Sequence, residues 1–507
     1  MWNYNGWVSH QDPAESVHPR TATILLSQAA KWRAFAVAVS VAALTILDLS
    51  KVNVSLPSIE ASLGADSTQL QLIVSGYVLA FGLFLVPMGR LGDQRSRRAL
   101  FIVGLATFTL ASLACALAPT AELLMAARFI QGIGAGIQMP QVLGIIQQIF
   151  VGKERGRAFG LFGAVISIST AIGPTLGGLL IALGGDGDGW RWIFWINLPL
   201  GLAAIAAAIW VLPTTKGRSP RPVTLDPVGV ILFGLAIFAL MWPFLFTTGS
   251  PDDDPMRWWL LVVFVVVAAL FVAWERRYAA SGKVPLIPFS LFQISSYRNA
   301  TLLVTFYFAG LPALFLLTTL YLQTGLGLAP VFAGMVGIGF AVASAVGSWI
   351  GGNLVSTHGR GVVVWGLIIV LAAIAGLVAT AVLVPAEWAP YAMAGVMVFA
   401  GAGGGLVVSP NQTLALADIP VREGGLAGSL GQLGQRIGTA VGTAVGLALF
   451  YATIFRESDS KASLEVYHDA YMIGSISVAV FISLALVIGV VDMTRRRRGA
   501  ASDEFQI

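Results

Sequence analysis

Long apolar blocks separated by short polar segments dominate the pattern along this chain. Most blocks hold about 20 residues or more, the length that an α-helix needs to cross the hydrocarbon core of a bilayer. The pattern predicts an all-α polytopic membrane protein with fourteen transmembrane helices and no soluble domain between them. The expected spans are residues 33–56, 71–90, 99–118, 121–149, 157–183, 192–212, 227–248, 257–276, 298–323, 330–355, 361–384, 389–416, 424–454 and 468–492.

The charges between the spans predict how the helices are oriented, because cytoplasmic loops are enriched in Lys and Arg. With the N-terminus inside, most of the 30 basic residues fall in inside connections, among them 90–98, 153–157 and 495–498. The outside connections are more acidic, as in GSPDDDPMRWW (249–259). The sequence therefore predicts that both termini lie in the cytoplasm.

Composition agrees with the membrane class. Of the 507 residues, 57% are hydrophobic and only 11% are charged, whereas about a quarter of the residues of a soluble protein are charged. The net charge of +5 is explained by loop charge, so we expect no nucleic-acid partner. Arg far outnumbers Lys, and Ala, Gly and Val are abundant, which favours a GC-rich bacterium and hence a multi-pass protein of the bacterial cytoplasmic membrane.

Cofactor and enzyme chemistry find little support in the sequence. Cys115 is the single cysteine, so it forms no internal disulfide and fits no metal pattern. No catalytic Ser/His/Asp set and no phosphate-binding P-loop occur, so we expect neither an enzyme nor a cofactor nor ATP drive. The four histidines lie outside the span interiors, at His10, His18, His358 and His468.

The longest connection, about 277–297, contains VPLIPFSLF (284–292). A short apolar segment of this kind can lie flat in the membrane interface. We expect it to lie on the membrane surface.

The stretch LDLSKVNVSLP (47–57) places an acid and a base inside the first span. Intramembrane ionisable residues are costly and usually face a cavity or a partner. At about 100° per residue, Asp48, Lys51 and Ser55 share one helix face, and a spacing of three lets the two charges meet. Three interpretations stay open: a proton switch, a static ion pair that holds helix packing, and a Lys51 side chain that snorkels to the outer surface.

The other basic residues inside spans are Arg128 and Arg436, so positive charge exceeds negative charge within the membrane. A site for hydrophobic cations would be expected to hold spare acids. The hypothesis is therefore an anionic, zwitterionic or neutral amphipathic substrate.

An internal repeat relates two loops, GRLGDQRSRR (89–98) and GNLVSTHGRG (352–361). Transporters are commonly built from two repeats with the substrate site between them. The second copy carries Ser356 where the first carries Asp93, so the two halves are not equivalent.

The first of these loops resembles the signature loop of the major facilitator superfamily, with Ser96 in place of the usual second glycine. An acid here can stabilise a helix N-terminus, and arginines can pair with it. The run RFIQGIGAG (128–136) is similar to a second motif of that superfamily. STAIGPTLGG (169–178) resembles its antiporter motif, in which proline bends a helix and glycines allow close packing.

Together with WRWIFWINLPLG (190–201), PLIPFSLF (285–292) and SPNQTLALADIP (409–420), these motifs resemble the fourteen-helix drug/proton antiporter branch. Lys51 departs from the first-span pattern of that branch. The resemblance implies two six-helix halves with two extra helices between them. The expected domains are an N-terminal tail (1–32), an N-terminal half (33–212), a two-helix insertion (213–280), a C-terminal half (281–493) and a C-terminal tail (494–507).

The resemblance also implies proton-coupled export of amphipathic small molecules by alternating access, with transport of an anionic lipid or cell-envelope precursor as the alternative. The expected partners are protons, such a substrate and membrane lipids, and we expect a monomer. The proton-coupling candidates are Asp48, Lys51 and Arg128. The candidates for the substrate cavity are Gln131, Gln138, Gln141, Asn411, Gln412 and Arg436. The candidates for gating are Asp93, Arg97, Gly173, Pro174, Gly177 and Gly178.

Overall fold

The computed structural model describes residues 27–185, 187–213, 226–247, 253–457 and 463–504. Several expectations fall outside this part of the chain. These are the N-terminal tail up to residue 26, residues 249–252 of the acidic connection, and three further basic residues that the predicted orientation places inside, Lys216, Arg218 and Arg221.

Fourteen helical segments in the described chain are long and apolar enough to cross a membrane, which confirms the predicted number of spans. No β-strand occurs among the same residues, so the all-α prediction is also confirmed. The helices of the first half are α1 (Gln28–Leu63), α2 (Ser67–Gln94), α3 (Arg97–Leu117), α4 (Ala121–Ile149), α5 (Gly152–Gly184), α6 (Trp192–Trp195) and α7 (Asn197–Val211). They are followed by α8 (Pro227–Leu245) and α9 (Trp259–Ala280), and then by α10 (Ser295–Leu320), α11 (Pro330–Met335), α12 (Ile338–His358), α13 (Arg360–Leu383), α14 (Ala389–Ala415), α15 (Gly424–Glu457) and α16 (Leu464–Glu504).

Local sequence signals explain where several helices begin. Asp66 and Gln69 form a reciprocal capping box at the start of α2. The side chains of Ser96 and Thr120 accept backbone N–H bonds at the starts of α3 and α4. These caps explain the short, sharp turns between consecutive spans.

The first helix is longer than predicted. It continues through Pro57 and ends at Leu63, followed by Gly64, whose φ of 62° suits glycine. The predicted end at residue 56 is therefore wrong, because one proline removes a single helical hydrogen bond without breaking this helix.

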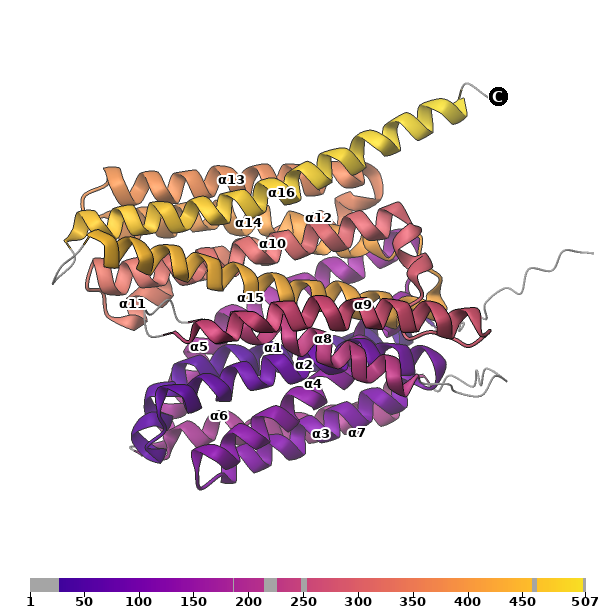
Figure 1. Cartoon of the computed structure of the whole chain (residues 1–507), viewed down its shortest axis with the longest axis horizontal. Coiled ribbons are helices and arrows are strands. Elements are labelled where there is room, and N and C mark those ends of the chain that lie inside the picture. The colour runs from indigo at the N-terminus through magenta and orange to yellow at the C-terminus, as the bar shows by residue number, and fades with distance from the viewer. Residues whose placement is uncertain (1–26, 186, 214–225, 248–252, 458–462, 505–507) are drawn as a thin grey trace, which may run out of the picture.

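The helices form two groups that lie side by side, α1–α7 and α10–α16 (Figure 1). Across the boundary, α2 and α4 pack on α15, and α5 packs on α12 and α14. Helix α8 packs on α9 and contacts both groups through α2 and α15. The exact domain boundaries stay a prediction.

The connection after α9 is packed on the protein. Leu286, Ile287 and Leu291 are buried in a hydrophobic core that is shared by the first half, α8, α9 and part of the second half, and the Ile287 N–H donates to Glu275 Oε2 over 3.1 Å. These three side chains therefore pack on the protein, and the expectation that the segment lies on the membrane surface stays a prediction.

Candidate proton-coupling and substrate sites

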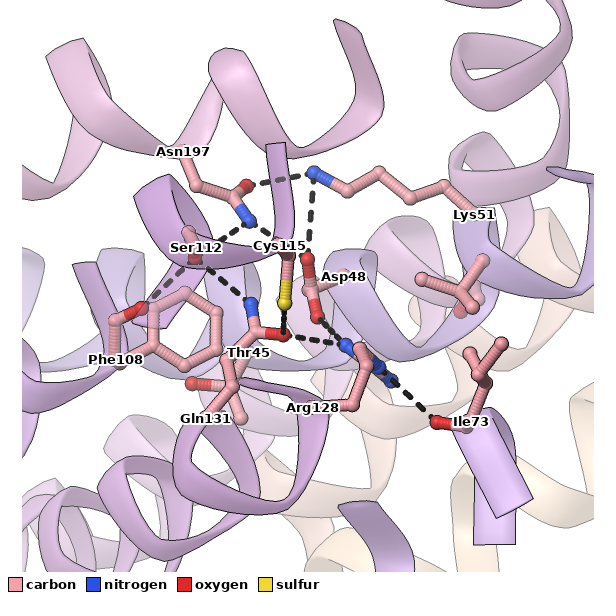
Figure 2. A network of polar contacts seen from close by, with 12 residues as sticks. Thr45, Asp48, Lys51, Ile73, Phe108, Ser112, Cys115, Arg128, Gln131 and Asn197 are labelled. Atoms are coloured by element: carbon pink, nitrogen blue, oxygen red, sulfur yellow. Dashed lines mark hydrogen bonds and ion pairs between the residues drawn. The ribbon is translucent and has the colours of Figure 1, made fainter. Parts of the chain in front are cut away.

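Asp48 lies at the centre of a buried charge network in the first half (Figure 2). Its Oδ2 accepts a hydrogen bond of 2.7 Å from Arg128 Nη1. Its Oδ1 accepts one of 2.7 Å from Asn197 Nδ2 and lies 3.7 Å from Lys51 Nζ. All four side chains have 0% relative exposure, so the network is closed to water in this conformation.

A second layer of bonds fixes the cations. Lys51 Nζ donates to Asn197 Oδ1 over 2.6 Å. Arg128 donates to Gln131 Oε1 and to the Ile73 carbonyl, over 2.6 and 3.2 Å. Gln131 Nε2 in turn donates to Ser112 Oγ over 2.8 Å. The network therefore joins five helices, α1, α2, α3, α4 and α7, around one carboxylate (Figure 2).

These contacts decide one question that the sequence left open. Lys51 does not snorkel to the surface, because its ammonium is fully buried against Asn197 and Asp48. That alternative is wrong. The proton switch and the static ion pair both remain compatible with the geometry.

Sequence reasoning missed Asn197 and Ser112 as members of the network. Asn197 was inside the quoted motif WRWIFWINLPLG, where an amide in an otherwise apolar segment was an available signal. Ser112 gave no comparable signal, because serine is common in membrane helices.

The network keeps one excess positive charge, since Lys51 and Arg128 face the single acid Asp48. The guanidinium Cζ of Arg128 also lies 4.2 Å from the ring centroid of Tyr77. An aromatic face stabilises a cation where water is excluded. Breaking a buried pair by neutralising one partner is costly, so the ionised carboxylate of Asp48 contributes to holding the joined helices together.

Gln138 and Gln141, the other candidate glutamines of α4, make contacts within the first half. Gln138 Nε2 donates to Thr45 Oγ1 over 2.7 Å. Gln141 Nε2 donates to the carbonyls of Met88 and Ile137, over 3.0 and 3.1 Å. The bonds to Thr45 and Met88 join helices, whereas the bond to Ile137 stays within α4. A role for Gln131, Gln138 or Gln141 in binding substrate stays a prediction.

The substrate candidates of the second half differ in their surroundings. Asn411 is buried, donates to the Ala300 carbonyl and accepts from Arg360, which also pairs with Asp492 over 2.6 Å. Gln412 is half-buried beside it. The buried Arg360–Asp492 pair was not predicted, although Arg360 stands in the repeat loop where the first copy has Arg97.

The gating candidates Asp93 and Arg97 join the two halves. Asp93 accepts the backbone N–H groups of Gly425 and Leu426, over 3.0 and 2.8 Å, at the N-terminus of α15. Arg97 Nη2 donates to Asp93 over 2.7 Å and to the Val421 carbonyl over 2.7 Å. A carboxylate is favoured at the positive end of a helix, so the negative charge of Asp93 suits its place at the N-terminus of α15.

The glycine motif of α5 packs against the helix that carries Asp48. A Cβ on Gly173 would lie 2.3 Å from Ser50 Cβ, and one on Gly177 would lie 3.0 Å from the Lys51 carbonyl oxygen. Pro174 is exposed, and a Cβ on Gly178 would meet nothing within 4 Å. The expectation of close packing at Gly178 is wrong, because this residue faces away from α1.

The halves are closed on each other at one end, the end with the α2–α3 and α4–α5 turns. Among the described residues, every hydrogen bond between α1–α7 and α10–α16 lies from this end to mid-membrane. The deepest joins Ser167 and Ser344, whose hydroxyl oxygens are 3.0 Å apart. In the part of the chain that the structure describes, no such bond joins the halves at the opposite end.

Paired helical halves, fourteen membrane-length helices and a buried charge network define a polytopic membrane transporter. The chain belongs to the Major Facilitator Superfamily, whose family profile matches residues 38–443. It is accordingly a secondary transporter and a multi-pass protein of the bacterial plasma membrane.

Relatives among known proteins agree with this assignment. The chain is 34% identical over 428 residues to a Streptomyces coelicolor protein named "Probable actinorhodin transporter", covering 84% of this chain and 73% of that protein. It is 30% identical to the Methylenomycin A resistance protein of the same organism, covering 85% and 88%. The fold is similar to the crystal structure of the human organic anion transporter MFSD10, with a TM-score of 0.61, 15% identity and coverage of 90% and 99%.

Proposed function

We propose that this protein exports amphipathic small molecules in exchange for protons, with Asp48 as the proton carrier. The observation that carries the proposal is the one carboxylate of the buried network, Asp48, which pairs with the two cations Lys51 and Arg128. The printed names of the relatives, a transporter and an antibiotic resistance protein, support export of small molecules.

The contacts suggest how protonation can be coupled to movement. Ionised Asp48 ties α1 to α4 and α7, and a proton on Asp48 removes the charge that holds Lys51 and Arg128. Helix α5 packs on α1 through Gly173 and Gly177, and its other side packs on α12 in the second half. A change in the packing of α1 can therefore alter, through α5, the contact between the halves.

The predicted orientation indicates which side of the membrane the closed end faces. With both termini in the cytoplasm, the closed end is the cytoplasmic end and the protein faces outward. In this state a substrate would leave to the outside, whereas Asp48 is closed to water and would take up its proton only once the network opens. The hydrogen bonds between Asp93 and the N-terminus of α15 would then have to break before the next substrate binds from the inside.

The decisive experiment compares Asp48→Asn with Glu60→Gln, the same chemical change at an exposed position of the same helix. Purified protein in liposomes with an internal pH dye receives a proton gradient and panels of cationic, anionic and neutral amphipaths. We expect substrate-dependent proton flux in the wild type and in Glu60→Gln, and none in Asp48→Asn. Unchanged flux in Asp48→Asn would show that Asp48 is not the carrier and that its ion pairs are structural.

The alternative substrate is an anionic lipid or cell-envelope precursor, for which the excess of buried positive charge is the supporting observation. Including anionic lipids in the donor liposomes tests it in the same assay. Flux with these lipids and with no small amphipath would favour the alternative.

A further inference from the structure

Arg436 is a cation without a carboxylate partner in the described chain. It lies in α15 where this helix faces α2, and its Cζ is 4.6 Å from the ring centroid of Phe81. Other buried cations pair with acids: Lys51 and Arg128 with Asp48, Arg97 with Asp93, and Arg360 with Asp492. A half-buried guanidinium that lacks an acid leaves positive charge available to a ligand.

Unpaired polar groups surround this cation. The hydroxyl of Tyr77, one turn before Phe81 on α2, is fully buried and has no hydrogen-bond partner. Gln432, one turn before Arg436 on α15, is 8% exposed, and its Oε1 has no partner either. Buried polar groups are normally satisfied, so unpaired ones on two facing helices indicate a place for a bound molecule.

The position suits a ligand that enters from the open end. Residues 424–433 of α15 pack on α2 at the closed end, where Gly89 meets Gly425 and Ser429. Arg436 lies in the next turn beyond this contact, toward the end that the halves leave unsealed. A molecule that enters between the halves would therefore meet Arg436 before the seal.

We infer that Arg436 binds an anionic group of the transported molecule, a carboxylate or a chemically similar acid. A guanidinium can hold a carboxylate with two parallel hydrogen bonds. The faces of Phe81 and Tyr77 beside it offer an apolar surface for the body of an amphipath. This inference rests on the proposed transport function and adds the charge class of its substrate.

The anion site is separate from the proton site. Arg128 stacks on Tyr77 at 4.2 Å, the Tyr77 and Phe81 ring centroids are 6.1 Å apart, and Arg436 stacks on Phe81. The rings of Tyr77 and Phe81 thus lie between the guanidinium groups of Arg128 and Arg436. Proton coupling through Asp48 and anion recognition by Arg436 can therefore fail independently.

The test uses three probes with one fluorescent body: dansylglycine with a carboxylate, its neutral amide, and dansylcadaverine with an amine. Equilibrium binding to the full-length protein in nanodiscs, with no proton gradient, is measured for the wild type, Arg436→Gln and Arg436→Lys. Arg456→Gln, at the exposed end of the same helix, is the matched control.

We expect the wild type and Arg456→Gln to bind dansylglycine at least about tenfold more tightly than the amide, the scale of one charge-assisted contact. Arg436→Gln should lose this preference, and Arg436→Lys should keep part of it. A preference that survives in Arg436→Gln overturns the inference. A wild type that binds none of the probes, or that binds the amide or the amine as tightly as the carboxylate, also overturns it. Proton flux through Asp48 can persist in either case, so the two proposals are distinguishable.

Discussion

At the scale of single residues, Asp48 owes its environment to side chains from distant parts of the sequence. Arg128 and Asn197 contact one carboxylate oxygen each, and Lys51 reaches the same oxygen as Asn197. Asn197 has a double role, because it donates to Asp48 and accepts from Lys51. An amide can do both at once, whereas an apolar residue of similar size can do neither.

Replacing Asn197 by Leu should therefore destabilise the protein. The change leaves Lys51 and Asp48 each without one partner, at about 1–3 kcal/mol for a buried polar group left unsatisfied. The expected result is a lower melting temperature in detergent, measured by intrinsic tryptophan fluorescence.

The control for this change is Asn353→Leu, because Asn353 is exposed on α12 and bonds only its own helix. Equal melting temperatures for the two variants would contradict a structural role for Asn197 in the charge network.

At the scale of elements, the contact between α1 and α5 links the charge network to the boundary between the halves. Gly173 and Gly177 form that contact, whereas the neighbouring Gly178 faces open space. We therefore expect a larger side chain to disturb packing at Gly173 and to be tolerated at Gly178.

Gly173→Ala should push α1 and α5 apart, because the added carbon would lie 2.3 Å from Ser50 Cβ. Overpacking of this kind costs about 1–3 kcal/mol. We expect a lower melting temperature and reduced substrate flux in liposomes.

Gly178→Ala is the matched comparison and should leave flux unchanged, since alanine also favours the helix by about 1 kcal/mol over glycine. If Gly178→Ala impaired transport as strongly as Gly173→Ala, the close α1–α5 contact would not explain the motif.

At the scale of the whole molecule, the hydrogen bonds that join the halves in the described chain gather toward one end. Alternating access requires the closed end to open in each cycle. A covalent link between Ser167 and Ser344, whose hydroxyl oxygens are 3.0 Å apart, should therefore stop transport.

The experiment places cysteines at positions 167 and 344 in a Cys115→Ala background, which removes the single native thiol. Oxidation should abolish flux and reduction should restore it, while each single-cysteine variant stays insensitive to oxidation. Full flux in the oxidised double variant would mean that this end does not open during transport.

The amino-acid sequence by itself determined the class and most local features of this protein. The spans follow from apolar length, and the helix starts at α2, α3 and α4 follow from residues such as Asp66 and Thr120 that cap the adjacent backbone. The position of Asp48 and Lys51 on one helix face also follows from local geometry. These features depend on neighbours within a few residues, which a single sequence displays.

Only the tertiary structure decided which groups satisfy the buried charges. Asn197 is 149 residues from Asp48 and Gly425 is 332 residues from Asp93, and no local pattern reveals either partner. The burial of Lys51, the outward face of Gly178 and the absence of an acid beside Arg436 depend on how the helices pack. The physical reason is that the partner of a buried charge comes from the helix that packs beside it. Which helix that is depends on the tertiary structure and not on nearness in the sequence.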